Sequence, residues 1–102
     1  MADKLDSLIR EFASGKLAVH IKASKLIGNT DNIAIYEQQH ELLTVLWNVT
    51  DDKTKEIITL KYKERKQWVE VAELIGMNER TARRKYRAFK ENVAYQYFLQ
   101  SQ

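Results

Sequence analysis

The sequence contains no cysteine, no proline and only three glycines. The lack of cysteine excludes disulfide bonds and thiolate metal sites. Because proline is absent and glycine is scarce, little in the chain interrupts a helix. Few β-branched residues alternate with polar ones, as they would in half-buried strands. We therefore predict an all-α protein, and the length of 102 residues favours a single compact domain.

Membrane and secretory signals are also missing. No apolar run approaches the ~18 residues of a membrane span. The first six residues lack the basic start and apolar core of a secretory signal. We expect a cytoplasmic protein without a membrane partner.

Features of an enzyme are scarce as well. His20 and His40 are far apart, without metal-ligand spacing around them. No serine has a nucleophile setting, and there is no glycine-rich phosphate loop. The sequence thus predicts no catalytic residue, no metal and no cofactor, and we expect a protein that is not an enzyme.

Positive charge is concentrated towards the C-terminus. Residues 1–60 hold seven Lys and Arg against nine Asp and Glu, whereas residues 61–102 hold ten against five. Between Asn78 and Lys90 there are six cations and one acid, Glu79. This asymmetry suggests an acidic partner for the C-terminal half, although a solvated basic helix face would give the same pattern.

Apolar residues at helical spacing predict helices in the N-terminal half. The first helix carries Leu5, Leu8, Ile9 and Phe12, and Gly15 ends or bends it. A second runs over 16–27, with Leu17, His20, Ile21 and Ser24 on one face and Ile27 closing that face. A loop at 28–31 follows, and Asp31 or Asn32 can cap a third helix over 33–49. Trp47, like Trp68 further on, is expected to be core or half-buried packing.

Residues 50–92 carry the remaining predicted helices. Thr50, Asp51 and Asp52 can cap a helix that runs to about Lys63, and residues 64–67 form a polar turn. Residues 68–75 are predicted as a short helix with Val71, Ala72 and Ile75 inward, and residues 79 to about 92 as a longer one with Asn78 as N-cap.

The two C-terminal helices have the spacing of a helix-turn-helix. Helices that cross steeply after a three-residue turn need a small side chain at their contact, which Ala72 supplies. The turn needs a residue that tolerates positive φ, which Gly76 supplies. Met77 can fill the corner, and Ala82 can pack the second helix on the first.

The second of these helices has two unlike sides. At about 100° per residue, Ala82, Tyr86, Phe89 and Val93 form one stripe, which is predicted core, and the opposite side is mainly arginine. Arginine can bond two acceptors of guanine and can also grip phosphates. The predicted DNA-binding residues are Asn78, Glu79, Arg80, Arg83, Arg84, Arg87 and Lys90, with Lys66 and Gln67 in the preceding turn.

Residues 52–93 resemble region 4 of bacterial sigma factors, and more closely the small sigma-region-4-like regulators of phages and mobile elements, the ArpU- and RinA-like activators. The matching runs are Lys55-Glu56-Ile57-Ile58 with Leu60 and Tyr62, then residues 68–82. Two positions depart from the pattern: Gln67 stands where a capping Ser or Thr is common, and Lys85 where an apolar residue is common. The resemblance implies a sequence-specific regulator of transcription that binds promoter DNA, and leaves contact with RNA polymerase open.

Several alternatives stay open. Residues 1–49 are predicted as a packing or oligomerisation region and residues 50–102 as the DNA-binding region. The stripe at Leu5–Phe12 either drives a homodimer or packs on the helix at 33–49. The aromatic tail at 93–99 either continues the last helix onto the N-terminal helices or forms a subunit interface. A DNA-packaging subunit similar to a small terminase, or a sigma-like module that binds RNA polymerase without DNA, are alternative functions.

Overall fold

The computed structural model describes residues 3–28 and 32–100, and in these ranges it contains helices and no strand. The elements are α1 (Lys4–Ala13), α2 (Lys16–Leu26), α3 (Ile33–Asn48), α4 (Asp52–Ile58), a π-helical segment η1 (Thr59–Lys63), α5 (Trp68–Ile75) and α6 (Glu79–Gln100). The predicted all-α class is confirmed. The radius of gyration is 14.5 Å, above the ~13 Å of a compact domain of this length, so the molecule is moderately elongated.

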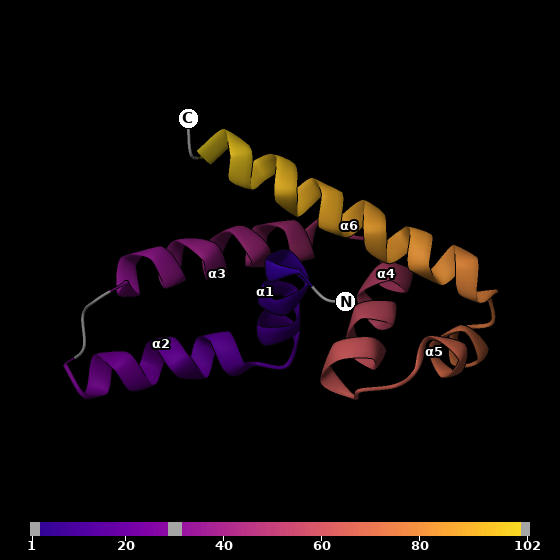
Figure 1. The fold of residues 1–102 in the computed structure, drawn as a ribbon, viewed down its shortest axis with the longest axis horizontal. Coiled ribbons are helices and arrows are strands. Elements are labelled where there is room, and N and C mark those ends of the chain that lie inside the picture. The colour runs from indigo at the N-terminus through magenta and orange to yellow at the C-terminus, as the bar shows by residue number, and fades with distance from the viewer. Residues whose placement is uncertain (1–2, 29–31, 101–102) are drawn as a thin grey trace.

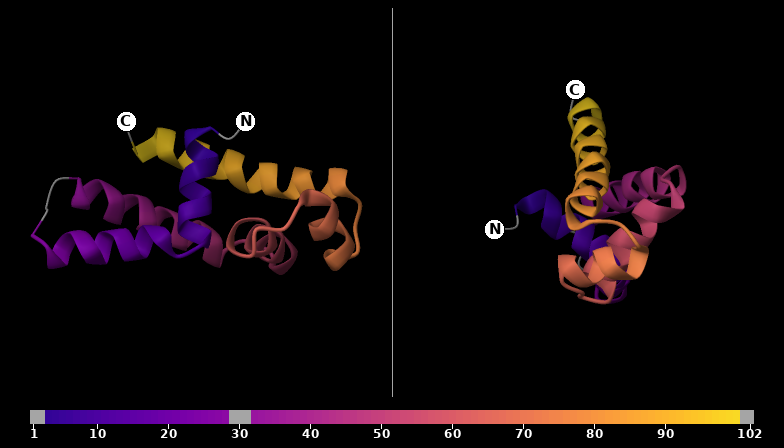
Figure 2. Two further views of the ribbon diagram at one scale, coloured as in Figure 1. Left: turned by 60° about the horizontal axis from the view of Figure 1, so that its bottom comes forward. Right: turned by 90° about the vertical axis from the view of Figure 1, so that its right-hand side faces the viewer.

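Helix α6 joins the two ends of this elongated molecule (Figure 1). It packs against α4 and α5 on one side and also contacts α1 and α3. The α2–α3 hairpin lies at the end of the long axis opposite to α5. Figure 2 shows α1 crossing the direction of α6 between these two ends. Helices from both halves of the chain therefore support α6.

Short polar contacts fix where several helices begin. The Asp3 side chain accepts a hydrogen bond from the Asp6 backbone N–H at 2.8 Å, and the Asp6 carboxylate accepts one from the Asp3 N–H at 3.3 Å. This reciprocal arrangement satisfies two backbone donors of α1. Asp51 caps α4 by accepting from the backbone N–H of Thr54 at 3.0 Å and from its hydroxyl at 2.8 Å. The predicted cap around residues 50–52 is therefore confirmed, with Asp51 as the capping residue.

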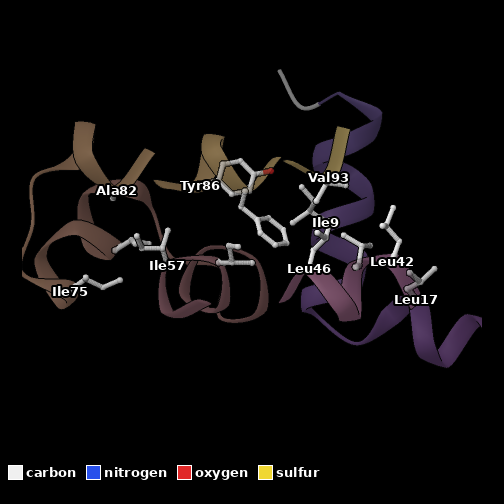
Figure 3. Packing of buried hydrophobic residues seen from close by; sticks show 13 residues of the cluster. Ile9, Leu17, Leu42, Leu46, Ile57, Ile75, Ala82, Tyr86 and Val93 are labelled. Atoms are coloured by element: carbon white, nitrogen blue, oxygen red, sulfur yellow. The ribbon is translucent and has the colours of Figure 1, made fainter. Parts of the chain in front are cut away.

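One hydrophobic core extends through both halves of the chain (Figure 3). Its fully buried large side chains are Ile9, Leu43, Ile57, Ile58, Val71 and Val93. Trp47 packs edge-on against Phe12 and Phe89, with ring centroids 6.0 and 6.4 Å apart. The predicted packing role of Trp47 is confirmed, and the core joins α1, α2, α3, α4, α5 and α6.

The apolar stripe of α1 belongs to this core. Ile9 is fully buried, and Leu5, Leu8 and Phe12 are partly buried against the core cluster. Of the two roles predicted for the stripe, intramolecular packing is therefore the one observed. The homodimer through this stripe stays a prediction, because Leu5, Leu8 and Phe12 are only partly buried within the chain.

Several local expectations differ from the structure, and one lies partly outside the described residues. Ile27 does not close the inner face of α2, since it is 76% exposed beyond the helix end. Asn32 precedes α3 in a left-handed conformation (φ 64°) without a side-chain cap; Asp31, the other predicted cap, lies outside the described residues. The helix expected to reach Lys63 changes to π-type hydrogen bonding at Thr59. Helix α6 passes Asn92 and ends at Gln100, which confirms that the tail continues the helix.

Candidate nucleic-acid interface

The junction between α5 and α6 is built from small residues and one left-handed glycine. Ala72 and Ala82 are buried, as expected where α5 and α6 pack together. Gly76 ends α5 at φ 79°, and its N–H donates to the Ala72 carbonyl at 2.9 Å. The N–H of Met77 donates to the same carbonyl at 3.1 Å. These two bonds satisfy the Ala72 carbonyl at the end of α5, and the left-handed Gly76 lets the chain turn sharply into α6.

The first turn of α6 is capped as the sequence predicts. The Oδ1 atom of Asn78 accepts a hydrogen bond from the Thr81 backbone N–H at 2.8 Å. Gln67 occupies the equivalent place before α5, where its own backbone N–H donates to the Glu70 carboxylate at 3.3 Å. The side-chain oxygen of Asn78 is therefore already used within the protein.

The two sides of α6 differ as predicted. Ala82, Tyr86, Phe89 and Val93 are at most 7% exposed, which confirms the core stripe. Arg80, Arg83, Arg84 and Arg87 are exposed and, with Glu79, line one shallow depression on the helix surface. The structure thus brings together five of the nine predicted site residues on one side of α6. We call the exposed surface formed by these four arginines and Glu79 the arginine face.

Arg83 is held at the edge of this face. Its guanidinium bonds Glu79 Oε1 through Nε at 3.0 Å and through Nη2 at 2.7 Å. The same guanidinium lies 5.1 Å from the centroid of the Trp68 ring, and Lys61 Nζ lies 5.4 Å from it. Trp68 also packs against Tyr86 at 5.8 Å. A cation near an aromatic ring is weakly attracted to it, so Trp68 helps to orient both cations.

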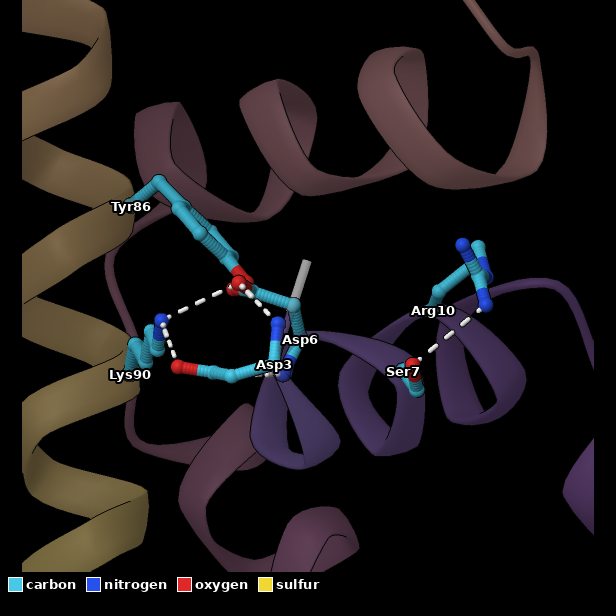
Figure 4. A network of polar contacts seen from close by, with 6 residues as sticks. All are labelled: Asp3, Asp6, Ser7, Arg10, Tyr86 and Lys90. Carbon is cyan, nitrogen blue, oxygen red and sulfur yellow. Dashed lines mark hydrogen bonds and ion pairs between the residues drawn. The ribbon is translucent and has the colours of Figure 1, made fainter. Parts of the chain in front are cut away.

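Lys90 is engaged by α1 rather than left open (Figure 4). Its Nζ lies 2.8 Å from an Asp3 oxygen and 3.1 Å from an Asp6 oxygen. The hydrogen bond to Asp3 is the main cause that raises the pKa of Lys90, and the same bond is the main cause that lowers the pKa of Asp3. Tyr86 Oη donates to the other Asp6 oxygen at 2.5 Å. Burial, and then this bond, raise the pKa of the Tyr86 hydroxyl, which stays protonated.

Lys66 and Gln67 lie just before α5, away from the depression on α6. Lys66 is half-buried, and its carbonyl accepts a hydrogen bond from Lys61 Nζ at 3.5 Å. Gln67 is exposed. Their predicted contact with DNA stays a prediction, in a position distinct from that of the arginines.

Sequence reasoning missed a second, larger depression beside the arginine face. Its volume is about 610 Å³, and its lining includes Arg10, Lys61, Tyr62 and Trp68 together with Arg83 and Arg87. Arg10 comes from α1 and Lys61 from η1, so their proximity depends on tertiary packing. The cationic character of residues 61–66 was the available signal, but it did not indicate the contribution of α1.

The described residues offer no clear metal or membrane site. Within 3–28 and 32–100, no group of three or more His, Asp or Glu side chains is placed to hold a metal ion. No helix in the same ranges has the length and apolar character needed to cross a membrane.

Comparison with known families places the chain in one of them. A family model described as "Protein of unknown function (DUF722)" matches residues 27–95. The chain belongs to this family. The DUF722 match spans α3, α4, η1, α5 and most of α6, and so includes the arginine face. Helices α1 and α2 lie before it. No curated protein and no solved structure matches the chain.

Proposed function

We propose that this DUF722 protein is a sequence-specific regulator of transcription that binds duplex DNA through a helix-turn-helix formed by α5 and α6. The observation that carries the proposal is the exposed arginine face of α6, opposite a stripe buried in the core. Within residues 3–28 and 32–100, no carboxylate forms an ion pair with Arg80, Arg84 or Arg87. Their positive charge is therefore available to an external anion.

The dimensions of duplex DNA suit this face. The major groove is about 12 Å wide and admits one α-helix with its side chains. In a helix-turn-helix, the N-terminal residues of the second helix reach the base edges. Arg80 and Arg84 lie in the first two turns of α6, and Arg87 lies one turn further on. We expect Arg80 and Arg84 to contact bases or adjacent phosphates, and Arg87 to contact the backbone.

The regulatory part of the proposal comes from the resemblance of residues 52–93 to sigma region 4 and the phage regulators. The α4-to-α6 arrangement supports it, because α4 packs against both α5 and α6 and so braces the pair. Lys85 stands where the sigma-like pattern commonly has an apolar residue, and it is half-buried. The neighbouring Tyr86 is buried and can take over that packing role.

The test compares single alanine substitutions of Arg80, Arg84, Arg87 and Phe89 on a site selected from random duplexes. We expect Arg84→Ala to leave the melting temperature nearly unchanged, because exposed substitutions usually alter stability by under about 0.5 kcal/mol. It should weaken duplex binding by about 1–3 kcal/mol if Arg84 reads a base. Phe89→Ala should instead destabilise the fold by roughly 3–5 kcal/mol, because that ring is only 5% exposed.

Lys22→Ala is the matched control, since Lys22 is an exposed cation on α2, outside the arginine face. Fluorescence anisotropy with labelled duplex measures affinity, and thermal denaturation of the same samples measures stability. If substitutions of Arg80, Arg84 and Arg87 all bind the selected site as the unmodified protein does, α6 is not the recognition helix. Binding to RNA polymerase alone, without any duplex, would favour the sigma-like interaction module.

A further inference from the structure

We infer that the DNA-binding surface continues beyond α6 along a basic groove onto α1 and the start of α2, where Arg10, Lys16 and Arg65 hold phosphates of the duplex outside the recognised site. This inference rests on the proposed function. It concerns residues that the helix-turn-helix does not include, two of which, Arg10 and Lys16, also lie before the DUF722 match at residues 27–95.

The groove is continuous because neighbouring depressions share lining residues. The depression on α6 shares Arg83 and Arg87 with the larger one that contains Trp68. The larger one shares Arg10, Lys61 and Tyr62 with a third depression. That third depression reaches Lys16 at the start of α2 and Arg65 in the loop after η1. A single path thus leads from the start of α6 to the corner between α1 and α2.

The path carries uncompensated positive charge. The acids that line it are Asp6 and Glu79, and both are already bonded within the protein: Asp6 to Tyr86 and Lys90, and Glu79 to Arg83. Among the described residues, no carboxylate pairs with Arg10, Lys16 or Arg65. All three side chains are exposed. The far end of the groove therefore presents to solvent three cations that no described carboxylate neutralises.

The arrangement favours the DNA backbone over the bases as the ligand. Arg10 lies near the end of α1, Lys16 at the start of α2 and Arg65 in the loop after η1. They therefore do not share one helix face with each other or with the arginines of α6. Cations spread over an open protein groove can neutralise phosphates, but they cannot enter the major groove of DNA together to contact bases. The two phosphate backbones of a duplex border its major groove. If α6 lies in the major groove, one backbone lies beside α6 and can continue along the basic groove of the protein.

The floor of the groove helps to keep its cations directed outward. Trp68 lies near both Lys61 and Arg83, and Tyr62 packs against Tyr86 with ring centroids 5.4 Å apart. The rings of Trp68 and Tyr62 are partly buried against the core cluster, so the floor is anchored to the rest of the fold. A rigid floor lowers the entropy lost when the cations above it bind a phosphate.

The experiment uses the full chain and the double variant Arg10→Gln/Lys16→Gln, with Arg65→Gln as an independent second variant in a loop. The matched control is Lys22→Gln/Lys53→Gln, which removes two exposed cations that line none of the three depressions. Dissociation constants are measured at several salt concentrations. The duplexes are the selected site alone, the site extended by about 10 base pairs on each side, which is one helical turn, and a scrambled sequence.

We expect the Arg10→Gln/Lys16→Gln variant to lose affinity for selected and scrambled extended duplexes by the same factor. The slope of log affinity against log salt should fall by about 0.9 for each phosphate that the variant no longer neutralises. The gain in affinity that the unmodified protein obtains from the extended duplex should shrink. Arg65→Gln should show the same pattern with a smaller loss, and the control should match the unmodified protein.

The outcomes separate this inference from the proposed function. If Arg84→Ala weakens binding while both groove variants keep the affinity and salt slope of the unmodified protein, the extended groove is wrong and the helix-turn-helix stands. If the unmodified protein binds no duplex, both are wrong. Tighter binding of a single strand than of the extended duplex would also overturn the inference.

Discussion

At the scale of single residues, the charge of Lys90 is balanced within the protein. Its partners Asp3 and Asp6 precede it by 87 and 84 positions in the sequence. No local pattern can predict an ion pair over that separation. Counting charges around α6 therefore overestimates the number of cations that are available to an external partner, because Lys90 is included. A phosphate that approaches Lys90 must compete with two carboxylates. We expect Lys90 to contribute less to DNA affinity than Arg84, which has no such partner among the described residues.

Asp51 gives a prediction of pH dependence. Its side chain accepts two hydrogen bonds from Thr54, and these bonds lower the pKa of its carboxyl group in the folded protein. A carboxyl group with a lowered folded pKa stabilises the protein fully above its unfolded pKa, near 4, and this stabilisation is lost as the pH falls below that value and through the lower, folded pKa. Asp51→Ala should reduce the free energy of unfolding at pH 7 by about 1 kcal/mol, as for other N-caps.

Urea denaturation at pH 7 and at pH 3 measures this effect. The difference between the unmodified protein and Asp51→Ala should be smaller at pH 3, because this pH lies below the unfolded pKa of the carboxyl group and part of its stabilisation is then lost. Asp52→Ala serves as the control, since Asp52 is an exposed acid in the same helical turn. A difference as large at pH 3 as at pH 7 would show that the charge of Asp51 plays no part.

At the scale of elements, local chemistry predicted the C-terminal helices well. The bounds of α5 and the start of α6 agree with the sequence, because Gly76 and Asn78 act through contacts with residues three or four positions away. The buried and exposed sides of α6 also follow from helical spacing alone. The α5–α6 junction and the arginine face of the candidate site were therefore accessible from the sequence.

Other elements depend on contacts that the sequence does not reveal. Ile27 was expected to be inward from its spacing, but α2 ends before it and its side chain is exposed. The π-helical segment η1 changes the helical phase near Leu60, where Glu64 N–H donates to the Thr59 carbonyl at 3.0 Å. Such a change is invisible to a constant period of 3.6 residues. The Arg10 side of the basic groove was missed because it requires α1 to dock near η1.

Gly76 allows a prediction for the turn between α5 and α6. A Cβ atom added at Gly76 would meet no heavy atom within 4 Å, so only the positive φ of 79° opposes a side chain there. Gly76→Ala should reduce the free energy of unfolding by about 1–2 kcal/mol, from the left-handed backbone conformation alone. Gly76→Asn should cost less, because asparagine tolerates that conformation better.

Chemical denaturation of both variants tests this order, and Gly28 supplies the comparison. Gly28 also has positive φ, at 74°, and open space around its Cβ position, but it lies outside the α5–α6 turn. Gly28→Ala should therefore be destabilising without affecting duplex binding. A greater loss with Asn than with Ala at position 76 would contradict a purely conformational cause.

At the scale of the whole molecule, the boundary predicted between residues 1–49 and 50–102 does not divide the core. Ile9, Leu43 and Leu46 belong to the same buried cluster as Ile57, Phe89 and Val93. The polar contacts agree, since Asp3 and Asp6 of α1 bond Tyr86 and Lys90 of α6. The arginine face is thus held in place by helices from both regions, and the N-terminal region has a structural role whether or not it contacts DNA.

This continuity predicts that the isolated fragment 50–102 does not fold cooperatively. Removing residues 1–49 takes away Trp47, which packs against Phe89, and the buried core residues Ile9, Leu43 and Leu46. A fully buried side chain such as each of these three aliphatic residues contributes about 1.5–3 kcal/mol. Three such losses together approach the roughly 5–15 kcal/mol of total stability of a native protein. Circular dichroism should show a sharp thermal transition for the full chain and a gradual one for the fragment. Adding a separate peptide of residues 1–49 should restore some cooperativity. A fragment that melts as sharply as the full chain, at a similar temperature, would show that α4, α5 and α6 form an independent unit.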